Sequence, residues 1–310
     1  MFVIRYARLW LSIGLVFVIV SLMSLAIFGL SFGADFVGGS VLEFRIANAD
    51  PSSQELKEVL IADEETDLVP RSVTRTGDST YRAEFAPFAT DAESEEVLEV
   101  VRTAYDTEEI SKADVVEELS SATVSPTVGQ ELRNRSLVAI VVVLFGIIAF
   151  ITYVFRGISH PVPSFYYGLS AIIALFHDIA IPVGIFAVLS SLEIVQIDLL
   201  FIIALLSILG ASVNDTIVVF DRVRENLRKI GGHRFEEVVG TSVSQTLARS
   251  MNTSLTLLVV LGAIFLFGGQ SVQYFALALF LGILFGTYSS IFIASPLLVL
   301  IYRLRFKKNL

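Results

Sequence analysis

The sequence predicts a polytopic α-helical membrane protein with six transmembrane helices and a ferredoxin-like α+β domain between helices 1 and 2. Three observations lead to this fold class. The chain of 310 residues is 54% hydrophobic and only 17% charged, whereas soluble domains carry roughly 25% charged residues. Six apolar stretches are long enough to cross a bilayer. One acidic segment, residues 35–135, separates the first stretch from the other five.

A transmembrane helix needs about 20 predominantly apolar residues. The expected spans are residues 9–30, 137–155, 165–189, 194–220, 251–267 and 272–302. The first span is longer than the apolar core of a signal peptide and lacks a small-residue cleavage site, so we expect an uncleaved anchor. The expected organisation is a cytoplasmic N-terminus and first helix (1–34), an extracytoplasmic domain (35–135), the other five helices (136–302) and a basic cytoplasmic tail (303–310).

The lysines and arginines of the short loops predict the orientation. Arg5 and Arg8 precede the first span, Arg156 follows the second, and six more basic residues lie between residues 222 and 249. The loops expected on the opposite side, 190–196 and 268–271, contain none. Both termini are therefore expected in the cytoplasm, with the acidic segment on the far side of the membrane.

Charge and composition exclude several function classes. The segment 35–135 holds 23 of the 31 acidic residues but only nine of the 22 lysines and arginines, which disfavours a nucleic-acid partner. The chain has no cysteine, so disulfides, thiolate metal sites and cysteine catalysis are excluded. Its three histidines are scattered, and we expect neither a metal site nor a cofactor.

The acidic segment shows the pattern of a small α+β domain. It alternates between strand-like and amphipathic helical patterns, with a Gly-Asp hairpin turn in the middle. The expected elements are a strand at 40–46, a capped helix at 52–60, strands at 72–76 and 81–85, a helix at 94–105 and a last strand or helix at 115–124. The order β-α-β-β-α-β predicts a ferredoxin-like domain. Its many carboxylates are interpreted as a solvated face.

Four sequence motifs indicate which protein family this chain resembles. They are DFVGG at residues 35–39, FHD at 176–178, GASVNDTIVVFDRVREN at 210–226 and SMNTSLT at 250–256. With the order of one span, a domain and five more spans, they resemble the SecF family, the smaller subunits of the bacterial SecD–SecF protein-export complex in the resistance-nodulation-division superfamily. The resemblance covers essentially the whole chain. Ala211 departs from the GYSVND form of the motif, and this change affects packing.

The resemblance implies a proton-motive-force-driven accessory subunit of the Sec preprotein translocase that assists late export. It implies a multi-pass protein of the bacterial cytoplasmic (inner) membrane, without enzymatic activity or cofactor. The implied partners are a SecD-like subunit, the SecYEG translocon, a YajC-like small membrane protein, the translocating preprotein and membrane lipid.

Asp215 is the sharpest candidate from the residues themselves. An ionisable residue inside a span is costly and usually functional. Asp215 lies between Asn214 and Thr216 on the cytoplasmic third of the fourth span. These two residues, with Asn252 and Thr253 of the fifth span, are interpreted as a polar helix-packing motif. Burial favours the neutral form of a carboxyl group and a nearby cation favours the charged form, so a proton carrier needs both. The alternative is a helix-end carboxylate in interfacial water.

Arg249 is the candidate cation. It begins the fifth span, and Asn252, Thr253 and Thr256 follow it on one helical face, a polar stripe that we expect to face Asp215. The resemblance supports this pairing, because related proteins pair the motif aspartate with an arginine at this position. The alternative is an arginine that only sets the topology.

Asp178 lies near the middle of the third span. It is either a second relay group or a neutral acid bonded to a neighbouring helix. Helical geometry places His177 about 100° away from it, as a packing histidine or a proton shuttle.

Asp35, Gly38 and Gly39 join the first span to the domain. Paired glycines allow backbone conformations closed to other residues. This junction is either a hinge or docking point between domain and membrane, or a tight turn into the first strand.

Three other functions compete. A half-size proton-coupled exporter of lipids or small molecules, from the same superfamily, usually carries two copies of the six-span unit, whereas this chain holds one. An intramembrane aspartyl protease would use Asp178 and Asp215, but the sequence patterns of those proteases are missing around both. A structural scaffold would not need Asp215.

Overall fold

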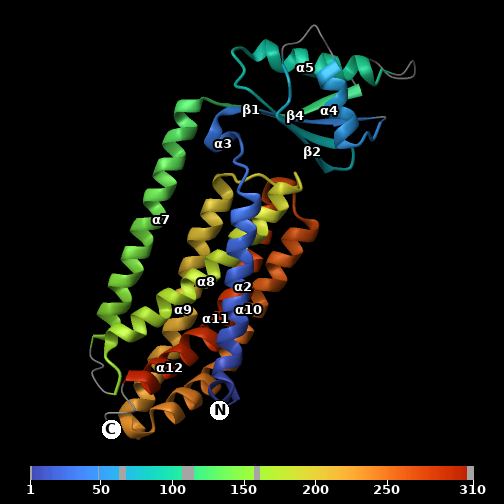
Figure 1. The fold of residues 1–310 in the computed structure, drawn as a ribbon. Coiled ribbons are helices and arrows are strands. Elements are labelled where there is room, and N and C mark those ends of the chain that lie inside the picture. Colours follow the sequence, from blue (N-terminus) through green and yellow to red (C-terminus); the bar gives the residue numbers. More distant parts are fainter. Residues whose placement is uncertain (1, 48, 63–67, 107–114, 157–160, 306–310) are drawn as a thin grey trace. The chain divides into compact units, whose positions relative to one another are not determined.

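The computed structural model describes residues 2–47, 49–62, 68–106, 115–156 and 161–305. The chain divides into two compact units (Figure 1). The first comprises Met1–Gly29, Val138–Val188 and Leu200–Leu310, and the second comprises Leu30–Leu137 and Leu189–Leu199. Of the predicted basic tail at 303–310, residues 306–310 lie outside the described residues.

Among the described residues, six helical spans are long and apolar enough to cross a membrane, which confirms the predicted number. After a short helix α1 (Phe2–Arg5), they are α2 (Ala7–Phe28), α7 (Pro126–Phe155), α8 (Ser164–Ser191), α9 (Leu199–Ile230), α10 (Phe235–Phe267) and a composite sixth span. The sixth span consists of α11 (Gln270–Ser289), a π-helical turn η2 (Ser290–Ala294) and α12 (Ser295–Arg305).

The fourth and fifth helices extend beyond the predicted spans. α9 begins at Leu199 and continues to Ile230, and α10 begins at Phe235 after a short 3-10 turn η1 (Gly232–Arg234). Charged residues end the apolar run, but apolar residues at helical spacing such as Val223 remain buried and keep the helices folded. The basic residues from Arg222 to Lys229 thus lie within α9.

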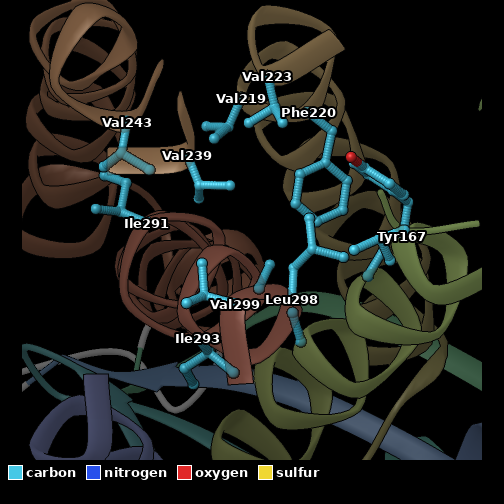
Figure 2. Packing of buried hydrophobic residues seen from close by; sticks show 14 of the residues in the cluster. Tyr167, Val219, Phe220, Val223, Val239, Val243, Ile291, Ile293, Leu298 and Val299 are labelled. Carbon is cyan, nitrogen blue, oxygen red and sulfur yellow. The ribbon is translucent and has the colours of Figure 1, made fainter. Parts of the chain in front are cut away.

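A buried apolar cluster holds the first unit together where α8, α9, α10, η2 and α12 meet (Figure 2). Tyr167 stacks on Phe155 with ring centroids 5.7 Å apart and meets Phe220 edge to face at 5.3 Å. The members labelled in Figure 2 are Tyr167, Val219, Phe220, Val223, Val239, Val243, Ile291, Ile293, Leu298 and Val299. This cluster packs as the core of a soluble helical protein does.

Two helices of the first unit approach each other very closely. A Cβ atom added at Gly184 of α8 would lie 2.5 Å from the Cα atom of Ser21 on α2. Such backbone proximity requires small residues on both helices, as is common in membrane bundles.

The second unit contains the predicted ferredoxin-like domain. Its elements are α3 (Ala34–Val37), β1 (Gly39–Ile46), α4 (Ser53–Ala62), β2 (Ser72–Gly77), β3 (Thr80–Phe85), α5 (Asp91–Ala104) and β4 (Val116–Val124). The sheet order is β2-β3-β1-β4, with every neighbouring pair antiparallel. The segment 115–124, which the sequence left open between strand and helix, forms strand β4.

Local sequence signals fix the elements of this domain. Ser52 and Glu55 form a reciprocal capping box at the start of α4, with N–H to side-chain oxygen distances of 3.2 and 2.8 Å. The β2–β3 hairpin turns at Asp78 and Ser79, where Ser79 adopts φ 53°. Alternate residues of β1, including Leu42 and Phe44, are fully buried against the helices.

The close approach at Gly184 predicts a stability effect. Gly184→Ala should destabilise the bundle by about 1–3 kcal/mol, because the added methyl group overpacks the contact with Ser21. The unfolding midpoint of the purified protein in detergent measures this. Gly146→Ala on α7 is the matched control, since its Cβ has open space within 4 Å, and helix propensity alone should leave that variant equally or more stable. Equal midpoints for the two variants would contradict the prediction.

Candidate functional site

A pocket of about 190 Å³ in the first unit is lined by α9, α10 and α11. Asp215 and Arg249, predicted from sequence to face one another, both line it, as do Asn214 and Thr253. The structure therefore brings four of the predicted polar residues into one space that is large enough for water.

Asp215 has few hydrogen-bond partners in this pocket. The Ser254 hydroxyl donates to Asp215 Oδ2 over a long 3.5 Å, and Thr287 Oγ1 donates to Ser254 Oγ at 2.6 Å. Between residues 161 and 305, which the structure describes without a gap, no ion pair joins Asp215 to Arg249. The carboxylate is thus partly buried, reached by a chain of two hydroxyls, and shares its pocket with an arginine that it does not touch.

The face that α10 presents to α9 differs from the predicted one. Ser250 and Ser254, four residues apart, are 2% and 4% exposed, and both line the pocket. Asn252 is exposed and does not line it, so this part of the predicted stripe is wrong. The face toward the pocket keeps Arg249 and Thr253 of the predicted stripe but continues to Ser250 and Ser254 in place of Asn252, so it is rotated by about one residue.

Thr216 also lies outside the pocket. It is 2% exposed, and its Oγ1 lies 2.9 Å from Ser290 Oγ of the π turn. This contact ties α9 to the sixth span, so Thr216 is a packing contact between helices.

Asp178 is fully buried among hydrogen-bond donors. Ser289 Oγ donates to its Oδ2 at 2.7 Å, Ser212 Oγ donates to the same oxygen, and His177 Nδ1 lies 2.9 Å from its Oδ1. The prediction that His177 points away from Asp178 is wrong. The two Cα positions are about 100° apart around the helix, but the imidazole turns toward its neighbour and reaches the carboxylate.

Ser212 and Gly286 connect Asp178 to the pocket. Both line the pocket, and Ser212 also bonds Asp178. A Cβ atom at Gly286 would lie 3.2 Å from Ser212 Cβ and 3.7 Å from Asp178 Oδ2, so the glycine leaves room for this contact. Within residues 161–305, no hydrogen bond joins the carboxyl groups of Asp178 and Asp215, and the carboxyl pair of an aspartyl protease is not formed.

The junction residues of the second unit are held by close contacts. Gly38 has φ 78°, and its Cβ would lie 2.6 Å from Pro126 Cα. The Cβ of Gly39 would lie 2.7 Å from Phe85 O. Both positions therefore need glycine. Asp35 accepts a hydrogen bond from the backbone N–H of Leu199 at 3.0 Å.

Glu84 is a buried carboxylate near this junction that the sequence did not single out. Only 7% of it is exposed, and desolvation raises its pKa above the ordinary value, against the opposing charge of Arg82 at 3.8 Å. The sequence does not indicate that Glu84 is buried. In the alternating pattern of a strand, a polar residue at such a position normally faces water.

The comparisons with known proteins identify the family. The model of the SecD/SecF protein export membrane protein C-terminal region matches residues 106–304, and the SecD/SecF GG motif matches residues 24–49. A protein translocase subunit SecF from Thermobaculum terrenum is 40% identical over 309 residues, covering 96% of this chain and 92% of the relative. This chain belongs to the SecF family. The predicted family and multi-pass membrane fold are thereby confirmed.

Other relatives of the SecF family agree. A SecF from Anaerolinea thermophila is 37% identical, covering 94% of this chain and 91% of the relative. The crystal structure of SecDF, a translocon-associated membrane protein from Thermus thermophilus, superposes with a TM-score of 0.80 at 29% identity. It covers 97% of this SecF-family chain, which spans 38% of the SecDF chain.

The buried Glu84 predicts a pH dependence of stability. Because the pKa of Glu84 is raised in the folded state, protonation of this carboxyl favours the folded state. This stabilisation is fully present below the ordinary glutamate pKa of about 4.3 and is lost as pH rises through the raised value. Glu84→Gln should therefore make the sheet more stable at pH 8 and reduce the difference between pH 5 and pH 8. Hydrogen exchange of the β1 and β3 amides, corrected for intrinsic rates, measures this in the whole protein. Glu118→Gln on the exposed face of β4 is the control and should change neither value.

Proposed function

We propose that proton movement through the helical bundle drives this chain as an accessory subunit of the Sec preprotein translocase during late export. The observation that carries the proposal is the shared pocket of Asp215 and Arg249 on facing helices. A carboxylate kept inside an apolar span costs free energy, and such residues mark ion or proton pathways.

The incomplete bonding of Asp215 suits a proton carrier. Among the residues that the structure describes, its one hydrogen bond is the long contact from Ser254, which leaves lone pairs free to accept a proton, and the pocket is large enough for water to reach them. Within residues 161–305, Arg249 lines the same pocket without an ion pair, so its approach would favour the carboxylate and its withdrawal the acid. Two arrangements of this pair would give the bundle a two-state element that protonation biases.

Asp178 supports a second position on the proposed path. Ser212 both lines the pocket and bonds Asp178, so a hydroxyl lies between the pocket and the buried acid. His177 Nδ1 lies 2.9 Å from the other oxygen of Asp178, so an imidazole adjoins the buried acid on the side away from Ser212.

The partners follow from the family. This chain spans 38% of the Thermus thermophilus SecDF chain, so we propose that a SecD-like subunit supplies the remaining part in a complex. The SecYEG translocon, a YajC-like small membrane protein, the moving preprotein and membrane lipid complete the proposed surroundings. The alternative of a half-size exporter of lipids or small molecules is less favoured, because the curated relatives are protein translocase subunits.

The proposed orientation places both termini and the basic ends of α9 and α10 in the cytoplasm of a bacterial cell, with the ferredoxin-like domain outside the cytoplasmic membrane. The proposal rests on the positive charges of the loops, since loops rich in lysine and arginine stay inside. The basic residues from Arg222 to Arg234 lie at the end of α9 and in the turn that follows it, and the opposite connection at 190–196 has no basic residue.

The proton-carrier role predicts the effect of one substitution. Asp215→Asn should abolish the gradient-dependent part of preprotein export, because the amide keeps the shape and hydrogen bonding of the acid but cannot titrate. The measurement is preprotein export into membrane vesicles that carry the variant as their sole copy of this chain, with and without a proton gradient.

The control lies on the same helix. Asp221 is exposed and pairs with Arg224 one turn away, so Asp221→Asn removes a carboxylate without touching the pocket and should leave gradient-dependent export within about twofold of wild type. Gradient-dependent export that persists undiminished in Asp215→Asn would refute the role of Asp215.

The orientation makes a separate prediction. A reporter enzyme that is active only outside the cytoplasm should be active when fused near Thr90 in the domain and silent when fused at Gly232 between α9 and α10. A reporter active only in the cytoplasm should give the opposite pattern at both positions. Activity of the first reporter at Gly232 would overturn the proposed topology.

A further inference from the structure

Two segments of the second unit that are far apart in the sequence pair along their backbones. Phe32 and Ile197 form a parallel bridge, Gly33 N donates to Ile197 O at 3.0 Å, and Ile197 N donates to Ser31 O at 2.9 Å. We call the paired segments, residues 31–35 and 196–199, the clamp. One segment follows the first span and the other leads directly into α9.

Asp35 acts at the end of this clamp. Its Oδ2 accepts the backbone N–H of Leu199, the first residue of α9, at 3.0 Å. The first N–H groups of a helix have no partner within the helix, and a carboxylate there also suits the helix dipole. Asp198 occupies the usual capping position just before the helix, but Asp35 reaches the helix from 164 positions away in the chain.

The sheet is bonded to the second clamp segment and to Gly38, three residues after the first segment. Arg71 Nη1 donates to Gly38 O at 2.8 Å, while the backbone N–H of Arg71 donates to Glu84 O at 2.6 Å. On the other segment, Gln196 Nε2 donates to Ser72 Oγ at 2.8 Å. The residues that hold the start of α9 are therefore bonded to strands β2 and β3 of the ferredoxin-like domain.

We infer that Asp35 is a positioning residue, which holds Leu199, the first residue of α9, to the ferredoxin-like domain through the clamp. Asp215 lies 16 residues further along the same helix, about 24 Å at 1.5 Å per residue. Asp35 thus acts on the proposed proton carrier only through the helix that bears it. The positioning role requires a side-chain acceptor atom at position 35. It does not require a titratable proton there.

This requirement separates Asp35 from a proton carrier. Asp35→Asn keeps an oxygen acceptor, and asparagine caps helices as well as aspartate does, so export should stay within about twofold of wild type. Asp35→Ala removes the acceptor. Hydrogen exchange of the first-turn amides of α9 should then become about fivefold faster, the effect expected for a lost cap, and gradient-dependent export should fall.

The absence of cysteine from the chain allows a rescue experiment. Paired β-bridge positions lie within disulfide range, so the pair Phe32→Cys and Ile197→Cys can lock the clamp in the Asp35→Ala background. Oxidation should restore export to within about twofold of wild type, and reduction should remove the gain. Asp78→Ala, in the exposed hairpin turn of the same domain, controls for the loss of an acidic residue and should change nothing.

The export readout rests on the proposed function, whereas the amide exchange of α9 does not. Unchanged exchange in Asp35→Ala would overturn the inference even if Asp215 proves essential. Loss of export in Asp35→Asn as severe as in Asp35→Ala would also overturn it, because charge or titration would then be the requirement. Failure of the disulfide to rescue export, with the variant inserted at the wild-type level, would show that holding the clamp is not the role.

Discussion

A polar group inside a bilayer has to find its partner within the protein, because lipid offers none. Asp178 meets this constraint with hydroxyl groups from α9 and α11 and the imidazole of its neighbour His177. Serine suits the purpose, since it adds a donor while letting helices approach closely. The buried acid therefore links α8 to α9 and α11 through directional hydrogen bonds in addition to apolar packing.

The two intramembrane acids differ in how completely this constraint is met. Asp178 is fully buried and has partners at both oxygens, whereas Asp215 is partly exposed to a pocket and has one long contact. A fully bonded acid is held in one place, whereas an incompletely bonded acid in a pocket shared with an arginine has lone pairs left for other partners. The proposed proton carrier is therefore the acid whose bonding is incomplete, and the fully bonded acid lies in the bundle interior.

Much of this arrangement could be predicted from local signals. The six spans, the capping box at Ser52 and the β-α-β-β-α-β order all rest on patterns within a few residues, and the structure has them. Asp215 was found because charge in an apolar run is conspicuous, whereas Arg249, at the start of the fifth span, was paired with it through the family resemblance. Ser250 and Ser254 were missed, because serine is common on both buried and exposed faces and only the packing of α10 against α9 distinguishes them.

Contacts between distant segments could not be predicted in the same way. Nothing near Asp35 indicates that its acceptor serves an amide at residue 199, and the start of the fourth span was placed too early because residues 194–198 are apolar enough to pass for helix. Pairing with residues 31–33 takes these residues out of the helix. At the start of α9, hydrogen bonds between distant segments decide where the helix begins, although residues 194–198 are apolar. At the end of α9, buried apolar residues extend the helix past the charged residues that end the apolar run.

The π turn in the sixth span lets one helix serve two different surroundings. Before it, α11 presents Ile283, Gly286 and Thr287 to a polar pocket, and after it α12 buries Leu298 and Val299 in the apolar cluster. A π turn carries one residue more than an α-helical turn, so the face of the helix rotates by about 100° where it occurs. Sequence substitutions on the two sides are thereby decoupled: the polar half can change to suit its pocket without turning the apolar half away from the core.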